Sequence, residues 1–524
     1  MPAVAGFRGP IRYEELPEQF NIVPCLIDRH VAEGRGDDPA IVTPDRTISY
    51  AGLDAGVARA ARLLERLGVQ REQRVALLLR DSPEFAYVFF GAMKAGMVPV
   101  PLSTLGTPDD CEYALRDSRA AALVTDVATY PRVEPVWRKV PTLRGCLVTG
   151  EAPPGTLAFE PALAAEPAGY DAAPTHRDDM AYWLYSSGTT GRPKAIVHLH
   201  HDMLFCVEPY VRHVLALESR DRTFAVPRLF FSYGLTSCLY LPLAVGASTV
   251  LVAERPDPAG VFELCARLRP TVFFSVPTSF AALLRRAEVT PPDLSSLRLC
   301  VSAGEPLPAP LYERWVSRTG LECLDGLGAT EVGYIYISNR PGAVRPGSSG
   351  QLLPGYRARI ADAAGRDLPP GTVGDLWVSG ESVAAGYWNK HEKTKAAFVG
   401  EWYRTGDQYQ VDTDGYYVYQ GRADDLLRVA GNWVSPLEVE SCLLEHPGVA
   451  ECAVVGSQDA DGLEKPRAFV VLHPGTPAAG LEESLRAHAR ARLQPFKTPR
   501  WVTVVADLPK TATGKVQRYR LRAG

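Results

Sequence analysis

The chain has 524 residues, of which 46% are hydrophobic and 22% charged, and its formal net charge is −4. This length exceeds that of one typical core, so two or more subdomains are expected, with the composition of an ordinary water-soluble globular protein. The charge argues against the broad basic surface of a nucleic-acid binder, and no apolar run is long enough to cross a bilayer. Neither nucleic acid nor membrane is therefore expected as a partner.

Ten cysteines are scattered along the chain without a Cys-x-x-Cys pair. This spacing indicates neither a zinc site nor a disulfide framework, and reduced thiols are the simplest account. The first ten residues lack the apolar core of a signal peptide. The sequence therefore predicts a cytoplasmic protein.

Residues 11–45 look like an irregular entry segment. A helix is predicted to begin at Ser49, a capping residue, and to end at Gly68, with apolar side chains at helical spacing between them. Buried strands and helices then alternate, which favours α/β layers with parallel sheet. Residues 151–178 show no clear period and are expected to be a surface connection. Core strands are predicted at 75–79, 98–100, 121–124, 145–148, 223–226, 247–252, 271–276 and 298–304.

The stretch from Tyr185 to Lys194 is the most distinctive in the chain, with four Ser and Thr hydroxyls, two glycines and two cations. Backbone N–H groups near glycine, together with hydroxyls, give the dense donors that a polyphosphate needs. A solvated turn is the ordinary alternative, but apolar runs at 180–184 and 195–197 predict buried strands on both sides. A phosphate-binding hairpin is therefore predicted, distinct from a Walker A loop because Arg192 follows Gly191.

A second, smaller unit is predicted to begin near Asp424. Ser435 and Glu438 are expected to form a capping box around Pro436, and strands and helices follow up to residue 505. This is an α+β unit of one small domain's length. The predicted fold class is α/β, with a large N-terminal domain of layered α/β subdomains (1–423) and a smaller α+β C-terminal domain (424–524).

The run from Ser186 to Lys194 reads S-S-G-T-T-G-R-P-K and resembles the phosphate loop of the adenylate-forming superfamily, which includes acyl-CoA synthetases, adenylation domains and luciferases. Four further segments resemble superfamily motifs in the same order, so the resemblance covers nearly the whole chain. They are Asp325 to Glu331 (adenine and Mg²⁺), Tyr403 to Asp407 (ribose), Gly421 to Asp424 (ribose and hinge) and Pro509 to Lys515 (catalytic lysine).

The resemblance implies ATP, Mg²⁺ and coenzyme A as cofactors and co-substrates. It implies that Lys515 meets the charge developing at the α-phosphate, that Thr330 contacts phosphate and that Glu331 holds Mg²⁺. A hard cation that bridges phosphates usually takes one or two carboxylates and water, which agrees with one glutamate. The implied nucleotide contacts are Ser186, Ser187, Gly188, Thr189, Thr190, Gly191, Lys194, Gly304, Glu305, Pro306, Asp325, Gly326, Leu327, Gly328, Thr330, Asp407, Tyr419 and Arg422.

The implied first half-reaction is in-line attack of a carboxylate on the α-phosphorus of ATP, which gives an acyl adenylate and pyrophosphate. The protein's task is positioning and charge neutralisation, and no nucleophilic side chain is needed. His198, His200 and His201 follow the phosphate loop. They are expected to be structural or to shape the substrate site rather than to act as a base.

In the second half-reaction of the superfamily the mobile small domain rotates about a hinge, here Asp424, and a thiol attacks the adenylate. The rotation withdraws the lysine and brings in a loop, matched here by Gly431 and Asn432, where the usual Gly-Gly or Gly-Glu is altered to Ala-Gly-Asn. Lys497 and Arg500 are candidates for the CoA phosphates, against the alternative of a solvated face.

The N-terminal domain is most similar to the benzoate–CoA ligase branch, for example in the run from Phe230 to Gly234. Ser232 stands where those ligases have alanine, and Gly333-Tyr334 where they have Leu-His. A hydroxyl and extra room beside the ring predict a substituent that can hydrogen-bond, with 2-aminobenzoate (anthranilate) as the leading acid and hydroxybenzoate next. The expected flat pocket is lined by Ser232, Tyr233, Ala303, Gly328, Gly333 and Tyr334.

Two alternative functions stay open. One is a stand-alone aryl-adenylating enzyme that loads the phosphopantetheine of a carrier protein, although the chain contains no carrier domain. The other is a non-catalytic ligand-binding relative. The joint presence of Lys194, Glu331, Asp407, Arg422 and Lys515 speaks against it. The sequence does not determine the oligomeric state, for which a homodimer is the candidate.

Overall fold

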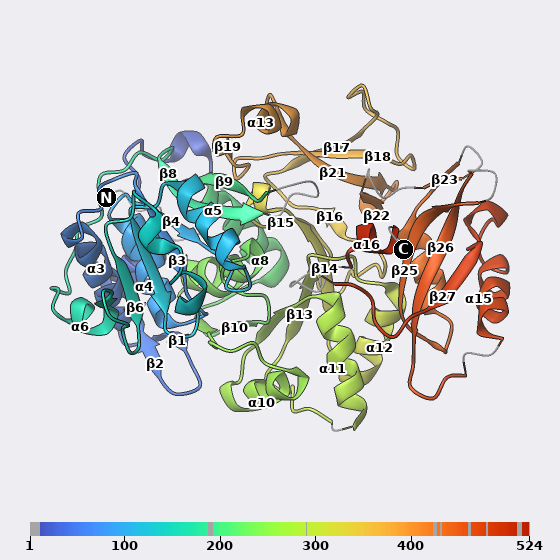
Figure 1. Ribbon diagram of the computed structural model, residues 1–524, viewed down its shortest axis with the longest axis horizontal. Coiled ribbons are helices and arrows are strands. Elements are labelled where there is room, and N and C mark those ends of the chain that lie inside the picture. Colours follow the sequence, from blue (N-terminus) through green and yellow to red (C-terminus); the bar gives the residue numbers. More distant parts are fainter. Residues whose placement is uncertain are drawn as a thin grey trace.

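The computed structural model describes residues 11–186, 192–289, 291–422, 427–429, 432–459, 463–477, 480–510 and 516–522. A large unit, described from residue 11 to 422, is built from three sheets with helices around them, and a small unit follows at the C-terminal end (Figure 1). None of the helices in the described ranges combines the length and the apolar character of a membrane-crossing segment.

The first sheet of the large unit is parallel, in the order β4-β3-β5-β6-β7. Strands β3 to β6 are almost wholly buried, as expected for a parallel sheet covered by helices on both faces. Helix α3 begins where the Ser49 side chain accepts a hydrogen bond from the Gly52 N–H, as predicted, and it packs against α4. The elements are α3 (Tyr50–Arg66), β3 (Arg74–Leu78), α4 (Pro83–Lys94), β4 (Val98–Pro101), α5 (Pro108–Ser118), β5 (Ala122–Asp126), β6 (Cys146–Thr149), β7 (Leu157–Ala158) and α6 (Phe159–Ala164).

The second sheet has a parallel half, in the order β14-β13-β12-β10-β11-β1, with β2 antiparallel at its edge. Helices α10, α11 and α12 follow its strands, at the lower edge of Figure 1. The strands are β1 (Pro39–Val42), β2 (Thr47–Ser49), β10 (Arg222–Ala225), β11 (Ser248–Val250), β12 (Val272–Ser275), β13 (Leu299–Ala303) and β14 (Cys323–Gly328). The helices are α7 (Asp202–Tyr210), α8 (Ser232–Leu235), α9 (Leu241–Val245), α10 (Pro258–Leu268), α11 (Pro277–Val289) and α12 (Ala309–Thr319).

Beyond β14 the same sheet becomes antiparallel, so strands distant in sequence join the parallel half. These strands are β15 (Ile335–Ser338), β16 (Gly350–Leu352), β17 (Arg357–Ala361), β18 (Gly374–Ser379), β20 (Phe398–Val399), β21 (Trp402–Val411) and β22 (Tyr416–Arg422). A third sheet, β19-β9-β8, contains the predicted hairpin: β8 (Met180–Ser186) and β9 (Lys194–Leu199) are antiparallel, and the short β19 (Gly386–Tyr387) pairs with β9. Helix α13 (His391–Ala397) follows β19.

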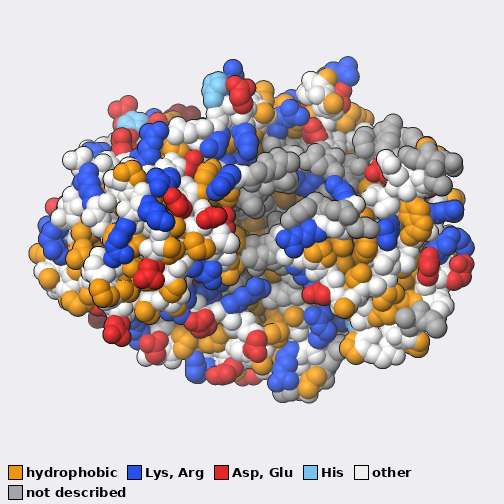
Figure 2. All heavy atoms as spheres, viewed as in Figure 1, with side chains coloured by type: hydrophobic (Ala, Val, Ile, Leu, Met, Phe, Trp, Pro, Cys, Tyr) orange, Lys and Arg blue, Asp and Glu red, His pale blue; other side chains and the backbone are white. Residues whose placement is uncertain are grey.

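The small unit has its own core of buried residues between 427 and 489. It contacts the large unit through α14, which touches β22 and α12. On the face drawn in Figure 2, lysine and arginine side chains are interspersed with aspartate and glutamate over the large unit. The elements are β23 (Leu427–Val429), β24 (Asn432–Val434), α14 (Pro436–Leu444), β25 (Val449–Gln458), β26 (Glu464–Leu472), α15 (Leu481–Arg490), β27 (Trp501–Val504) and α16 (Arg518–Arg522).

All predicted core strands are present, but two local predictions are wrong and a third is incomplete. Residues 11–45 are not irregular, because they contain α1 (Val23–Leu26), α2 (Asp28–Ala32) and β1, in stretches too short for periodicity to reveal. Residues 151–178 lie mostly at the surface, as predicted, but they contain β7 and α6, and Phe159 is buried. The capping box is only half formed. Ser435 accepts from the Glu438 N–H at 3.5 Å, but the Glu438 carboxylate pairs with Lys497 instead of closing the box.

Candidate active site

Part of the predicted site lies where β13 and β14 of the second sheet end. Gly304 and Gly328 are exposed there, although the strands leading to them are buried. Open α/β sheets bind ligands at the carboxyl ends of their strands, where such small residues leave room. Ser187, Gly188, Thr189, Thr190, Gly191, Asp424, Gly431 and Lys515 lie outside the described residues, as does the side chain of Asn432.

The phosphate hairpin and the turn after β14 meet through one ion pair. Lys194 Nζ, at the start of β9, lies 2.9 Å from Glu331 Oε1, and the Tyr387 hydroxyl donates to the same oxygen at 2.9 Å. Lys194 Nζ also lies 3.8 Å from the centre of the Tyr387 ring. Burial favours the neutral form of Glu331, but the Lys194 charge and these hydrogen bonds outweigh it, so the pKa of Glu331 lies below its ordinary value. Glu331 is therefore an ionised carboxylate.

The donor set at this pair suits a magnesium polyphosphate. Lys194 and Tyr387 both contact Oε1 of Glu331, so neither of them occupies Oε2, and an anionic oxygen of this kind suits a hard cation. The Ser186 hydroxyl, at the end of β8, is buried and has no hydrogen-bond partner within the described ranges. A buried hydroxyl without a partner fits a ligand that accepts a hydrogen bond, such as a phosphate oxygen.

The predicted ribose pair lies in the antiparallel half of the same sheet. Asp407 on β21 and Arg422 on β22 are opposite each other in register, and Arg422 Nη1 lies 2.9 Å from Asp407 Oδ1. Gly406 has φ +74°, and a Cβ there would lie 3.2 Å from Arg422 Nη2. The motif thus needs glycine at this position because of both its backbone and the close guanidinium.

A cavity of about 410 Å³ is lined by residues of the large unit and by residues at and near α14 of the small unit. It is lined by Pro306, Asp325 and Tyr419 from the predicted nucleotide set and by Lys497 from the predicted CoA set. Asp325 Oδ2 accepts from the Leu307 N–H at 3.3 Å, whereas Oδ1 is buried without a partner among the described residues. Burial raises the pKa of Asp325 well above its ordinary value. An unpartnered carboxyl oxygen here fits a donor such as the amino group of adenine.

The two candidates for the CoA phosphates differ in their surroundings. Lys497 Nζ lies 2.6 and 2.7 Å from the two carboxylate oxygens of Glu438, so a partner within the small unit already neutralises it. Arg500 is exposed just before β27, where its backbone N–H donates to the Pro466 carbonyl.

The residues predicted for the aromatic ring contact one another around α8. The Ser232 hydroxyl donates to the Gly333 carbonyl at 2.6 Å. The Tyr233 hydroxyl lies 3.0 Å from the Val301 carbonyl of β13, and the Tyr233 and Tyr334 rings are 6.2 Å apart. A Cβ on Gly328 would lie 2.9 Å from the Tyr334 carbonyl, so this position takes only glycine. Ala303, at the end of β13, is buried next to exposed Gly304.

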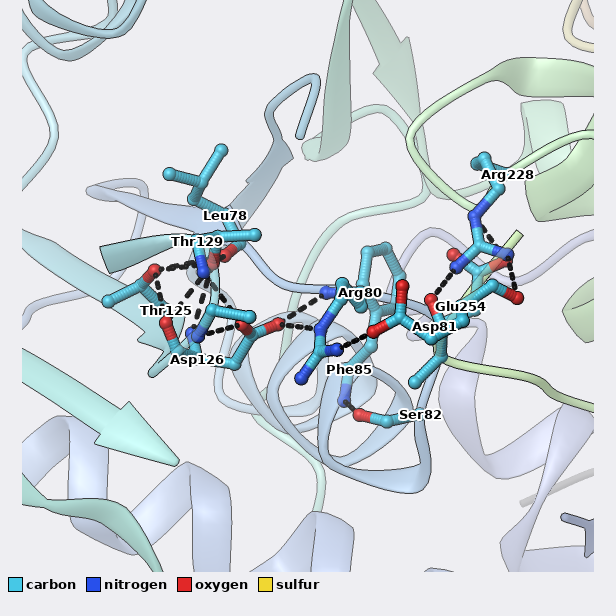
Figure 3. Close-up of polar contacts among 12 residues, drawn as sticks. Leu78, Arg80, Asp81, Ser82, Phe85, Thr125, Asp126, Thr129, Arg228 and Glu254 are labelled. Atoms are coloured by element: carbon cyan, nitrogen blue, oxygen red, sulfur yellow. Dashed lines mark hydrogen bonds and ion pairs between the residues drawn. The ribbon is translucent and has the colours of Figure 1, made fainter. Parts of the chain in front are cut away.

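The backbone shortly before Ser232 is held by the buried side chain of Asp81, which Figure 3 shows next to Arg228. Asp81 Oδ1 accepts from the Leu229 N–H at 3.2 Å, and Asp81 Oδ2 lies 3.3 Å from Arg228 Nε. Arg228 also donates to the carbonyls of residues 253 and 254. Burial raises the pKa of Asp81 to about 6, and the Arg228 charge opposes this rise. The anchor network comprises Asp81, Arg228, Glu254, Arg80 and Asp126.

Replacing Arg228 by methionine is expected to lower the free energy of unfolding by about 3 kcal/mol near neutral pH, because the buried Asp81 charge loses its partner. Without Arg228 the pKa of Asp81 rises further, so the variant takes up the proton at a higher pH than the wild type, and the loss should shrink as the pH falls toward about 6. Urea unfolding at about pH 8 and about pH 5 measures both effects. Arg220→Met, which removes the exposed pair with Glu218, is the control and should cost under about 1 kcal/mol. An Arg228→Met loss that does not change with pH would contradict this account.

The three histidines after the hairpin are buried. His198 bridges the Asp202 carboxylate, 2.8 Å from Nδ1, and the Thr330 carbonyl, 2.7 Å from Nε2, so it fixes the turn that carries Glu331. His200 Nδ1 accepts from the Ile22 N–H, and burial lowers the pKa of His200 to about 3. Tyr387 was not among the predicted site residues, because it lies in a two-residue strand outside every motif used above.

Comparisons with known proteins show the family of the chain. A model of the AMP-binding enzyme family matches residues 28–388, and a model of the AMP-binding enzyme C-terminal domain matches residues 438–515. The chain belongs to the AMP-binding enzyme family. This AMP-binding enzyme is 45% identical over 512 residues to a benzoate–CoA ligase of Thauera aromatica, with 97% of each chain covered. It is 44% identical to a 4-hydroxybenzoate–CoA/benzoate–CoA ligase of Rhodopseudomonas palustris, covering 96% of this chain and 94% of that one.

The AMP-binding enzyme also superposes, with a TM-score of 0.94, on the crystal structure of the anthranilate CoA ligase AuaEII in complex with anthranoyl-AMP. The two chains are 41% identical, and 98% of each is covered. These likenesses confirm the predicted superfamily, branch and α/β fold class. The protein is an AMP-forming aryl–CoA ligase that uses ATP and coenzyme A. The carrier-protein and non-catalytic alternatives are thereby disfavoured.

Proposed function

We propose that this aryl–CoA ligase activates a ring-substituted benzoate, with 2-aminobenzoate (anthranilate) as its preferred acid. The observation that carries the proposal is the direction of the Ser232 hydroxyl, whose single proton is given to the Gly333 carbonyl at 2.6 Å. A hydroxyl has one proton and two lone pairs, so the Ser232 oxygen can meet a ligand only as an acceptor. A ring substituent facing it must therefore donate a hydrogen bond, as an amino group does.

Relatives support both an unsubstituted and an amino-substituted ring. The benzoate–CoA ligase of Thauera aromatica is 45% identical to this chain, and the anthranilate CoA ligase AuaEII is 41% identical with a TM-score of 0.94. Ser232 favours the second. Plain benzoate would leave a half-buried hydroxyl oxygen without its donor, a loss that binding sites built for a hydrogen bond do not tolerate well.

We assign the first half-reaction to the residues gathered at the strand ends. A carboxylate oxygen bonds to the α-phosphorus of ATP, the bond from that phosphorus to pyrophosphate breaks, and the aryl adenylate stays bound. Lys194, Ser186 and Thr330 are assigned to the phosphates, and Lys515 to the charge that develops at the α-phosphate. The adenosine is assigned to the edge lined by Gly304, Glu305, Pro306, Asp325, Gly326, Leu327, Gly328, Asp407, Tyr419 and Arg422. Mg²⁺, assigned to Glu331, neutralises phosphate charge when it is bound.

In the second half-reaction the CoA sulfur bonds to the adenylate carbonyl carbon, the bond from that carbon to AMP breaks, and the thiol proton is released. We place the domain boundary between residues 423 and 424 and the hinge at Asp424. Gly431, Asn432, Lys497 and Arg500 are assigned to CoA. Because Glu438 holds Lys497 at 2.6 Å, a CoA phosphate has to displace that partner.

We also propose a reducing, cytoplasmic setting and a homodimer. The ten cysteines are free thiols, and most of them are buried. Light scattering, which measures the molar mass in solution, tests the proposed homodimer.

Ser232→Ala is the test of the substrate proposal. The wild-type enzyme is expected to prefer anthranilate over benzoate in acid-dependent pyrophosphate exchange, and Ser232→Ala should lose about 10- to 100-fold of that preference because the lone acceptor is removed. Thr236→Val is the control, since Thr236 lies 3.4 Å from the same Gly333 carbonyl and should keep the preference. The proposal fails if the wild-type enzyme activates plain benzoate better than every amino- or hydroxybenzoate tested.

A further inference from the structure

We infer that Tyr387 is a positioning residue of the phosphate site, with its hydroxyl holding the Glu331 carboxylate and its ring face supporting the Lys194 ammonium. Both contacts involve one side chain: the hydroxyl donates to Glu331 Oε1 at 2.9 Å, and Lys194 Nζ lies 3.8 Å from the ring centre. The inference rests on the proposed roles of Lys194 and Glu331, but it concerns a residue outside all the motifs that define the site.

The backbone around Tyr387 links the two segments that carry its partners. Strand β19 pairs with β9, and the neighbouring N–H groups of residues 385 and 388 donate to Val197 and Ala195 of β9 at 3.0 and 2.9 Å. On the other side, the Ala384 N–H donates to the Glu331 carbonyl at 2.8 Å. The segment from 384 to 388 is therefore bonded both to the strand that begins with Lys194 and to the turn that contains Glu331.

The Tyr387 ring is fixed from behind. Tyr387 is 6% exposed, and the Phe398 ring packs edge-on against it with the ring centres 5.2 Å apart. Its backbone N–H donates to the Thr394 hydroxyl at 3.1 Å. A ring held in this way can support a cation on its open face and aim its hydroxyl at a carboxylate without further loss of freedom.

The hydrogen bond from Tyr387 to Glu331 matters most when a nucleotide binds. Lys194 and Tyr387 share one oxygen of Glu331, so if Lys194 turns to a phosphate, Tyr387 is the remaining described donor to that buried oxygen. A buried carboxylate that loses a donor is destabilised, and a hydrogen bond to an ionised group is stronger than one between neutral groups. Tyr387 thus holds the Glu331 carboxylate in place while Lys194 changes partner.

Tyr387→Phe and Tyr387→Leu separate the two contacts, because phenylalanine keeps the ring and loses the hydroxyl, whereas leucine loses both. The readout is the calorimetric affinity for α,β-methylene-ATP, with Mg²⁺ and with excess EDTA. Tyr387→Phe should weaken binding about 10-fold with Mg²⁺ and little in EDTA, since the lost bond is the one to Glu331. Tyr387→Leu should weaken binding under both conditions, because Lys194 loses its support as well.

Further variants distinguish a failure of the inference about Tyr387 from a failure of the proposed role of Glu331. If Glu331→Gln leaves Mg²⁺-dependent binding unchanged, the proposed role of Glu331 fails. If Glu331→Gln weakens that binding while Tyr387→Phe binds like the wild type, the inference about Tyr387 is overturned. The double variant should bind no more weakly than Glu331→Gln alone, since Tyr387 acts through Glu331, and simple addition of the two losses would also overturn it. Tyr356→Phe, which removes a buried hydroxyl bonded to Ser382 at 2.7 Å, is the matched control and should bind normally.

Discussion

Lys515→Ala should reduce acid-dependent pyrophosphate exchange by about 10²- to 10³-fold, the usual cost of removing one group that stabilises charge in a transition state. The same variant should still convert a supplied aryl adenylate and CoA to the thioester at nearly the wild-type rate, because the lysine is assigned to the first half-reaction alone. The measurement is the two half-reactions assayed separately on one preparation.

Lys510→Ala is the matched control for this experiment. Lys510 belongs to the same motif, but its Nζ lies 2.6 Å from Glu451 and 3.3 Å from Asp507, and its backbone forms a bridge with Val516. It should therefore change exchange only slightly. Equal losses in both half-reactions for Lys515→Ala would point to damage to the small unit and not to the proposed role. Undiminished exchange would require another residue at the α-phosphate.

Lys194→Met should weaken ATP binding and lower pyrophosphate exchange by about 10²-fold, because the variant removes a phosphate ligand and leaves Glu331 buried without its cation. The affinity for α,β-methylene-ATP and the exchange rate, measured in the presence of Mg²⁺, report both effects. The loss should appear with every acid, since Lys194 is assigned to ATP and not to the ring.

Lys390→Met serves as the control for Lys194→Met. Lys390 lies near the same hairpin but pairs with Asp117 at 3.3 Å, on the side that faces α5. Its loss should leave ATP affinity close to that of the wild type. A Lys194→Met variant with normal affinity for the analogue would remove the hairpin from the proposed phosphate site.

The parts of the fold that follow from the sequence are those that local rules specify. The helix after Ser49 is capped by that residue, as predicted, and the buried strands appear where apolar runs predict them. The helices within residues 11–45 were not predicted because α1 and α2 have four and five residues, fewer than two helical turns. The partner of Glu438 was wrongly predicted for another reason: Lys497, 59 residues away, binds the carboxylate that would close the capping box.

The site residues that the sequence predicts are likewise those in distinctive local motifs, and the residues that were missed meet only in the folded chain. Lys194, Glu331, Asp407 and Arg422 lie in motifs with distinctive residues, and the structure pairs them as Lys194 with Glu331 and Arg422 with Asp407. Tyr387 was missed because a single tyrosine in a two-residue strand carries no pattern, and it meets Lys194 and Glu331 only through long-range contacts in the folded chain. The Asp81–Arg228 pair was missed likewise, since 147 positions separate two side chains that meet only in the folded chain.

The Lys194–Glu331 pair affects which ions can bind to the enzyme when no nucleotide is present. Each charge is already cancelled by the other at 2.9 Å. An anion that binds to the Lys194 ammonium alone leaves the Glu331 carboxylate without its cation, and a cation that binds to the carboxylate alone leaves the ammonium without its anion. Only a ligand that carries both charges avoids both losses. Free phosphate and free metal ions, although both are abundant in a cell, are therefore expected to bind weakly to this site.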